Sequence, residues 1–335
     1  MNRRSLCTMT AIAVALAAVT GTAGTAAADT IRIGYAPSVW DPSDFHGMMG
    51  SGIERGLDEA GVDYEFLIRA PSNHVAHEEQ LAIVEDMIAE GLDYIVINPT
   101  DPEVQRVAYE RVINSGIPLI VGNYSEPFPD DWGFQPMMFS GYSHSDAGET
   151  LATYLADKYG EGTTIAIIHG APGHITFERA PKERYHELGM EVVYEDFADY
   201  DRRMAYDAME RILVAYPDVD VIVAASSAMA VGAVEATIAN AAQGEYSIYG
   251  AGGTFEELRY IEEGLLTAAW IRDPVAMGEA VGEAIYQHSQ GNEDAVPPIF
   301  NSPIHIIDSV EAINEHVNPV IYEAEGLEFP RPTNN

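Results

Sequence analysis

Three kinds of side chain with binding chemistry recur just after short apolar runs: aromatic or imidazole rings, hydroxyls and amides, and guanidinium groups. Together with one glycine turn, the residues that we expect to bind a ligand are Trp40, Ser43, Phe45, His46, Asn123, Arg179, Tyr200, Ser226, Ser227, Gly252 and Arg272. A flat ring packs on the apolar face of a sugar, and a guanidinium donates paired hydrogen bonds to adjacent hydroxyls. This pattern indicates a site for a small polyhydroxylated molecule.

Each of these residues also has a structural interpretation that the sequence leaves open. Asn123 is a common type of turn residue, and the two arginines could form surface ion pairs. Trp40 and Phe45 could simply cover the core at the start of a helix. Arg179 and Arg272 carry more weight because Lys and Arg together number only 17 in the chain.

Sequence motifs for catalysis are absent. No G-x-G-x-x-G follows the first apolar run, and no G-x-x-x-x-G-K-[ST], H-E-x-x-H or G-x-S-x-G occurs. The glycine-rich residues 250–254 are typical of a tight strand-to-helix turn, and His74 with His77 lacks a second set of metal ligands. We therefore expect a binding protein rather than an enzyme, with no cofactor and no metal.

Acidic residues dominate the composition. Asp and Glu number 53 against 17 Lys and Arg, and the formal net charge is -36. Nucleic acid and anionic membrane surfaces are therefore poor partners. The acids are interspersed with aromatic and branched residues, which is typical of a folded, strongly hydrated surface. We expect a monomer.

The first 28 residues have the features of a cleaved secretory signal peptide. Arg3 and Arg4 precede an apolar run at residues 11–19, which is too short to anchor in a bilayer, and small residues of the A-x-A type follow. Cleavage would remove Cys7, the only cysteine, so the mature chain has no disulfide or thiolate chemistry. We expect export to the periplasm.

From residue 31 onward, short apolar runs alternate with amphipathic helices. We expect strands at residues 31–35, 62–68, 94–98, 118–122, 138–141, 164–169, 191–197, 219–224, 247–250, 267–271 and 302–307. The clearest helices are expected at residues 45–60, 77–90, 103–114 and 274–290. The alternation occurs twice and predicts two Rossmann-like α/β lobes with parallel sheets. Ligands of such sheets lie beyond the carboxyl ends of the strands, where the candidate residues fall.

Three segments resemble the ribose-type periplasmic binding proteins of type I. They are IVINPTD at residues 95–101, ADYDR at 198–202 and AMAVGAV at 228–234, and they occur in the family's order. The resemblance spans nearly the whole mature chain. It implies two lobes joined by a three-strand hinge, closure on a ligand, and delivery to the permease of an ABC importer.

The resemblance also implies how the chain is divided between the lobes. The N-terminal lobe is expected to contain residues 29–141 and 274–300, and the C-terminal lobe residues 142–273 and 301–318. Residues 319–335 are expected to form a peripheral C-terminal tail.

Within this family, the glycine turn at residues 250–254 is most similar to LuxP, the periplasmic receptor for a furanosyl borate autoinducer. Asn123, Arg179, Arg272 and Ser43 fall on positions that contact the ligand in that receptor. Two functions therefore stay open: the sugar- or polyol-binding component of an ABC importer, and a LuxP-like receptor that acts on a membrane sensor kinase. An enzyme on this scaffold would need an acid–base pair or a nucleophile at the crevice.

Departures from the family bear on the charge of the ligand. His46 and Ala251 stand where that receptor has tryptophans, and Asn123 and Gly252 stand where sugar importers have aspartates. A site that loses acids while it keeps arginines suits a neutral ligand or one with a single negative charge.

Overall fold

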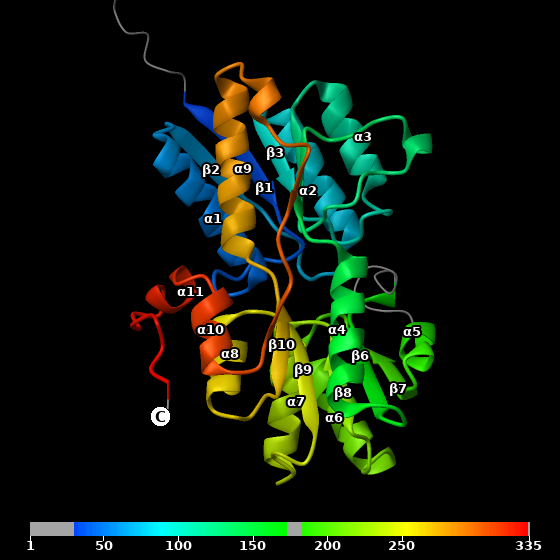
Figure 1. Cartoon of the computed structure of the whole chain (residues 1–335). Coiled ribbons are helices and arrows are strands. Elements are labelled where there is room, and N and C mark those ends of the chain that lie inside the picture. The colour runs from blue at the N-terminus through cyan, green and yellow to red at the C-terminus, as the bar shows by residue number, and fades with distance from the viewer. Residues whose placement is uncertain (1–29, 173–181, 334–335) are drawn as a thin grey trace, which may run out of the picture.

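The computed structural model describes residues 30–172 and 182–333, so the predicted signal peptide lies outside the described residues. Each of two lobes is built around a six-stranded sheet (Figure 1). The first sheet contains, in spatial order, β11 (Ile299–Asn301), β5 (Met138–Gly141), β4 (Leu119–Gly122), β3 (Tyr94–Ile97), β1 (Ile31–Ala36) and β2 (Tyr64–Ile68).

The second sheet repeats this plan. Its spatial order is β12 (His305–Ile307), β10 (Ala268–Ile271), β9 (Ser247–Gly252), β8 (Val221–Ala224), β6 (Thr164–His169) and β7 (Glu191–Phe197). The strands pair in parallel except for β12, which is antiparallel to β10. The predicted fold class of two parallel-sheet α/β lobes is confirmed.

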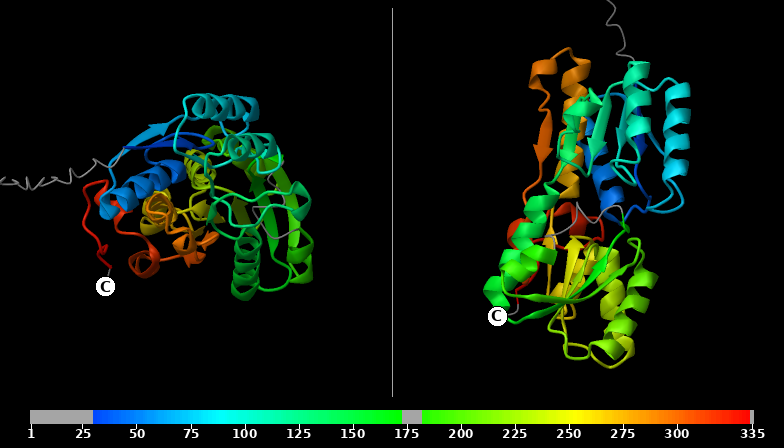
Figure 2. Two further views of the ribbon diagram at one scale, coloured as in Figure 1. Left: turned by 90° about the horizontal axis from the view of Figure 1, so that it is seen from above. Right: turned by 90° about the vertical axis from the view of Figure 1, so that its right-hand side faces the viewer.

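Helices surround both sheets (Figure 2). The upper lobe in Figure 1 carries α1 (Phe45–Ala60), α2 (His77–Ala89), α3 (Arg106–Ser115) and α9 (Pro274–Ser289). The lower lobe carries α4 (His144–Tyr159), α5 (Lys182–Glu187), α6 (Arg202–Ala215), α7 (Ser227–Ala239), α8 (Phe255–Glu262), α10 (Val310–His316) and α11 (Val320–Glu323). In the described part of the chain, no helix is long and apolar enough to cross a membrane.

Helices α1 and α9 pack backbone against backbone through glycines. A Cβ on Gly52 would lie 2.2 Å from the carbonyl oxygen of Val275, and one on Gly278 would lie 2.2 Å from that of Met49. Larger residues would therefore push the two helices apart. This close packing holds the start of α1, which faces the second lobe.

Within residues 30–172 and 182–333, the chain crosses between the lobes after β5, after β10 and between β11 and β12. Hydrogen bonds join these crossings: Ser302 N donates to Gly141 O at 2.8 Å, and Asp273 N donates to Ser302 Oγ at 3.0 Å. The crossings therefore form one connected hinge. The exact lobe boundaries drawn from the sequence stay predictions.

The last strand expected at residues 302–307 is shorter in the structure, and a further strand that was not expected precedes it. Residues Ile299–Asn301 pair with β5 in the first sheet, and His305–Ile307 pair with β10 in the second. The break falls at Ser302 and Pro303, because Ser302 N bonds to the hinge and proline has no N–H for a ladder.

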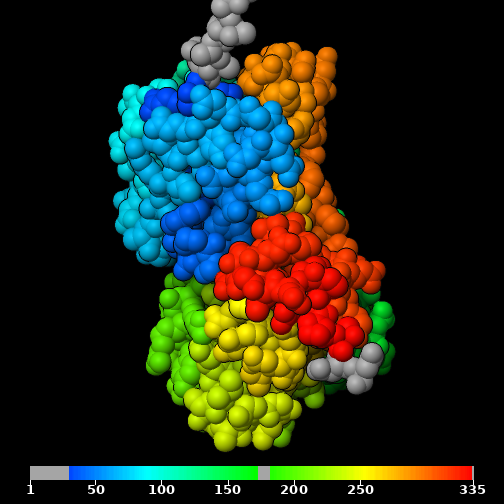
Figure 3. Space-filling model, turned by 90° about the vertical axis from the view of Figure 1, so that its left-hand side faces the viewer, coloured from blue at the N-terminus to red at the C-terminus, as the bar shows by residue number. Residues whose placement is uncertain are grey.

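The C-terminal segment is packed rather than peripheral. Tyr322 is fully buried, and its hydroxyl donates to Glu262 Oε1 at 3.1 Å. Arg331 Nε donates to the same oxygen at 2.9 Å. Figure 3 shows this red segment against both the blue residues of the upper lobe and the yellow residues of the lower lobe. It therefore flanks the junction of the lobes.

Candidate functional site

A cavity of about 130 Å³ lies between the lobes at the carboxyl ends of the strands. Its volume is roughly ten times what one buried water needs, so it has room for a small molecule. Its walls are formed by Ser38, Asp44, Phe45, His46, His74, Pro99, Asn123, Tyr142, Tyr200, Ala225, Ser226, Ser227, Ala228, Ala251, Gly252, Thr254 and Arg272.

Most of the residues predicted from the sequence meet at this cavity. They are Phe45, His46, Asn123, Tyr200, Ser226, Ser227, Gly252 and Arg272. Arg179 lies outside the described residues. That these side chains bind a ligand stays a prediction, but the structure brings them together from both lobes.

Two predicted residues, Ser43 and Trp40, lie away from the cavity. Ser43 Oγ donates to Asp41 Oδ1 at 2.7 Å, and the residue faces a different cavity beside α11. Trp40 is 37% exposed and packs edge-on against Tyr35, with ring centroids 6.3 Å apart. The loop after β1 folds back on itself, which removes both side chains from the site.

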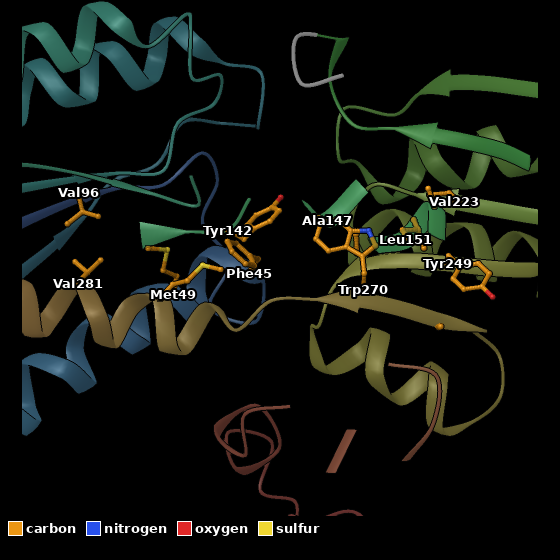
Figure 4. Close-up of a cluster of buried hydrophobic side chains, with 14 of the residues drawn as sticks. Phe45, Met49, Val96, Tyr142, Ala147, Leu151, Val223, Tyr249, Trp270 and Val281 are labelled. Atoms are coloured by element: carbon orange, nitrogen blue, oxygen red, sulfur yellow. The ribbon is translucent and has the colours of Figure 1, made fainter. Parts of the chain in front are cut away.

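Arg272 follows β10 and is held among aromatic rings. Its guanidinium carbon lies 4.2 Å from the ring centroid of Phe45, 4.5 Å from that of Tyr142 and 5.0 Å from that of Trp270. Figure 4 shows Phe45 beside Tyr142 where the lobes meet. These contacts orient the cation but use none of its N–H donors.

The donors of Arg272 are therefore available. Nε and Nη1 are shielded from solvent, and no partner for them exists among residues 30–172 and 182–333. A buried donor without a partner costs free energy, which a ligand hydroxyl or carboxylate in the cavity would recover. Arg272 is thus the clearest ligand-directed group of the site.

Asn123 follows β4 in the left-handed conformation, with φ of 57°. Its backbone N–H donates to Ser140 O at 2.8 Å, and its carbonyl oxygen lies 3.3 Å from His144 Nε2. Its Oδ1 is buried and has no partner among the described residues. The backbone is therefore held in place while the side-chain amide stays available to a ligand.

His46 uses both ring nitrogens within the protein. Nδ1 lies 3.0 Å from Asn98 Nδ2, and Nε2 lies 2.9 Å from Ser38 Oγ, which also contacts His74 Nδ1 at 3.1 Å. Burial lowers the pKa of His46 well below its usual value, and the charges of His74 and Arg272 lower it further. His46 therefore presents an uncharged ring to the cavity.

A ring contact closes one side of the cavity. His74 of the first lobe and Tyr200 of the second have ring centroids 5.1 Å apart. Tyr200 has φ of 62°, and its ring lies where Gly170 has no side chain, since a Cβ there would be 2.1 Å from Tyr200 Cζ. The left-handed turn and this glycine aim the ring at His74.

The second-lobe wall includes the start of α7 and the end of β9. Ser226 is the N-cap of α7 and accepts from Met229 N at 3.3 Å, so its hydroxyl holds the helix as well as facing the cavity. Gly252, at the end of β9, leaves room for Ser227, because a Cβ there would lie 2.1 Å from Ser227 Oγ.

Two carboxyl groups at or next to the cavity were not predicted from the sequence. Asp44 is the N-cap of α1 and accepts from Gly47 N at 2.9 Å, and burial raises its pKa to about 6. Glu257 lies behind the second-lobe wall, fully buried, and burial raises its pKa to about 7.

Ser38, His74, Tyr142 and Thr254 also line the cavity without having been predicted as ligand-binding residues. Ser38 lies two residues after β1, so the strand-end rule applied more closely would have found it. His74 and Tyr142 lie in a loop and a hinge crossing, and no local pattern places them. Among the described residues, no group of three His, Cys, Asp or Glu side chains could hold a metal ion.

Two α/β lobes joined by a hinge, with a cavity between them that is lined by rings, hydroxyls, an amide and a guanidinium group, define a two-lobed binding protein. The chain belongs to the periplasmic binding protein domain family, whose model matches residues 33–293. The family resemblance is thereby confirmed, while the closer likeness to LuxP stays a prediction.

The chain is similar to curated relatives that are named as binding proteins. It is 30% identical over 239 residues to the ribose import binding protein RbsB of Bacillus subtilis, covering 70% of this chain and 73% of that one. It is 28% identical over 276 residues to a putative rhizopine-binding protein of Rhizobium meliloti, covering 79% and 86%.

Solved structures share the fold. A solute-binding protein of Actinobacillus succinogenes with bound D-allose has a TM-score of 0.75 at 20% identity and covers 85% of this chain and 100% of that one. One of Bacillus halodurans with bound myo-inositol has a TM-score of 0.72 at 23% identity and covers 86% and 97%.

Proposed function

We propose that this chain is the periplasmic solute-binding component of an ABC importer and that it binds a sugar, a polyol or a related polyhydroxylated molecule. One observation carries the proposal: Arg272 and Asn123 line the same cavity, and the buried atoms Arg272 Nε, Arg272 Nη1 and Asn123 Oδ1 have no hydrogen-bond partner among the described residues. Donors and an acceptor fixed in one cavity match neighbouring hydroxyls of one ring.

The relatives support this class of ligand. The relative from Bacillus subtilis is named for ribose import, and a relative from Escherichia coli is named as a D-allose-binding periplasmic protein, 26% identical over 272 residues. A receptor that acts on a sensor kinase is the alternative. The importer is favoured because several relatives are named for ribose import.

Closure of the hinge is the proposed mechanism of capture. Arg272 contacts Phe45 across the junction, and Tyr200 faces His74, so the binding groups meet only when the lobes approach. In an open form, these groups would separate and the ligand could enter. The closed form would then be the one that docks on the membrane partner.

A thermal-shift screen of the mature chain tests the proposal. The panel contains pentoses, hexoses, inositols, sugar acids and borate complexes, and binding hits are measured by calorimetry. A true ligand raises the melting temperature, because binding to the native state alone stabilises it by mass action. Unaltered ligand recovered from the complex supports binding without catalysis. A panel without any shift contradicts the proposal.

Uptake of the ligand by cells distinguishes an importer component from a signalling receptor. A strain that lacks the chain should lose uptake of the labelled ligand found in the screen. Normal uptake together with a lost transcriptional response would instead support the receptor.

A further inference from the structure

We propose that Glu257, although it does not line the cavity, makes the site select uncharged sugars and polyols over sugar acids. Its carboxyl group lies behind the wall and opposes the charge of Arg272. This inference rests on the proposed function and narrows the class of ligand.

The position of Glu257 is set by hydrogen bonds to the cavity wall. Its Oε2 accepts from Ser227 Oγ at 2.7 Å and from Gly253 N at 2.7 Å. Ser227 itself lines the cavity, and Gly253 follows Gly252, which also lines it. The carboxyl group is therefore one hydrogen bond away from the residues that face the ligand.

The absence of a side chain at Gly250 leaves space for this carboxyl group. A Cβ on Gly250 would lie 2.0 Å from Glu257 Oε1, so any larger residue at that place would displace the carboxyl group. Glu257 has no exposed surface, so water screens its charge little.

Arg272 lacks a direct ion-pair partner within 4.0 Å in the described part of the chain. Its positive charge nevertheless acts on Glu257, where it lowers the pKa against the larger upward effect of burial. Asp44 is a second carboxyl group, and it lines the cavity directly. The cavity therefore has one carboxyl group on its wall, Asp44, and a second behind the wall, Glu257, on which the charge of Arg272 acts.

This balance of charges favours hydroxyls over carboxylates. Hydroxyls can pair with the donors of Arg272 without bringing a charge into the cavity. A ligand carboxylate would also gain from Arg272, but it would be repelled by the half-buried carboxyl group of Asp44 and by the fully buried one of Glu257, in a medium of low dielectric constant. The net charge of -36 opposes the approach of anions as well.

The test compares matched pairs of ligands by calorimetry at pH 8. The pairs are D-galactose with D-galacturonate, D-glucose with D-glucuronate, and D-mannose with D-mannuronate, in which the acid keeps the pyranose ring. The measured quantity is the ratio of the dissociation constants for the acid and the neutral sugar. We expect wild type to prefer the neutral member and Glu257→Gln to shift the ratio toward the acid by about tenfold.

Two variants separate charge from structure. Glu257→Asp keeps the charge and should keep the ratio near the wild-type value even where both affinities fall. Glu263→Gln makes the same chemical change at the exposed end of α8, where Glu263 lies 3.7 Å from Arg259 Nε, and should also keep the ratio. A structural role alone would weaken both ligands together and leave the ratio unmoved.

The outcomes distinguish this inference from the proposed function. Failure of wild type to bind any ligand of the screening panel overturns the proposed function and the inference with it. Binding of a neutral sugar with an unchanged ratio in Glu257→Gln overturns the inference alone, as does a wild-type preference for the acid. If Glu257→Gln does not fold, two measurements remain. A wild-type preference for the acid, or a ratio for Glu257→Asp that departs from the wild-type value, overturns the inference.

Discussion

The guanidinium carbon of Arg272 lies 4.2 Å from the ring centroid of Phe45, although the two residues follow elements of different sheets. Arg272 follows β10 of the second sheet, and Phe45 begins α1 beside the first. A ring at the start of α1 thus orients the ligand-directed cation in the crossing that follows β10. This relationship couples the binding group to the closed arrangement of the lobes.

Replacement of Arg272 should weaken binding without unfolding the protein. Arg272→Ala should raise the dissociation constant of the ligand found in the screen by about 30- to 150-fold, or about 2–3 kcal/mol, because paired charged donors are lost. Arg272→Lys should recover little, since an ammonium lacks the planar paired donors. Calorimetry measures the affinity, and the exposed Arg259→Ala serves as the control. Equal affinities in wild type and Arg272→Ala would exclude this residue from the site.

Asp44→Asn should stabilise the ligand-free protein at neutral pH. The pKa of Asp44 rises from 3.8 to about 6 on burial, so its contribution to stability is full below pH 3.8 and is lost as pH rises through 6. Asparagine keeps the N-cap and removes the buried charge. The free energy of unfolding in urea should rise by about 1 kcal/mol at pH 7.5 and change little at pH 4.

The matched control for Asp44 lies three residues earlier. Hydrogen bonds from Ser43 lower the pKa of Asp41, so Asp41→Asn should destabilise the protein at pH 7.5. The same sign of change for both variants would contradict the assignment of Asp44 as a buried, destabilising charge.

His46 should make stability depend on pH below about 6.5. Its pKa is lowered by burial, so the unfolded chain binds a proton that the folded chain excludes as pH falls below 6.5. The stability of wild type relative to His46→Phe should therefore fall by up to about 1.4 kcal/mol per pH unit between pH 6.5 and pH 5. Urea unfolding measures it, with the exposed His186→Phe as control. Parallel pH profiles for wild type and His46→Phe would refute the prediction.

Tyr322 should anchor the C-terminal segment. Tyr322→Ala should lower the free energy of unfolding by about 3 kcal/mol, because a fully buried ring leaves a cavity. Tyr322→Phe should cost about 1 kcal/mol through the lost hydrogen bond to Glu262. Leu327→Ala, at a side chain that is 37% exposed, should change stability little. Equal urea midpoints for Tyr322→Ala and wild type would show that the segment is dispensable.

Much of the fold follows from local patterns. The bounds predicted for β5, β6 and β7 match the structure, because apolar runs there end at glycine or polar turns. The helix expected at residues 103–114 begins later, at Arg106. Asp101 Oδ1 accepts from the backbone of Glu103 and Val104, which forms a separate turn before the helix.

The site was less predictable. Arg272 and Asn123 could be placed from sequence because the carboxyl ends of parallel strands meet at one edge. Ser43 could not, since its bond to Asp41 depends on how the loop after β1 folds back. His74 reaches the cavity through a hydrogen bond to Ser38, a residue 36 positions away.

Sequence alone determined the alternation of strands and helices, the repetition of that plan, and the sheet edge where binding groups collect. These features depend on the spacing of apolar residues within each short segment, and that spacing can be read from the sequence alone. Only tertiary structure decided that Arg272 lies on Phe45 and that Glu257 is buried behind the wall. Both depend on packing between segments far apart in the chain, and burial, which sets the cost of each charge, is defined only once those segments meet.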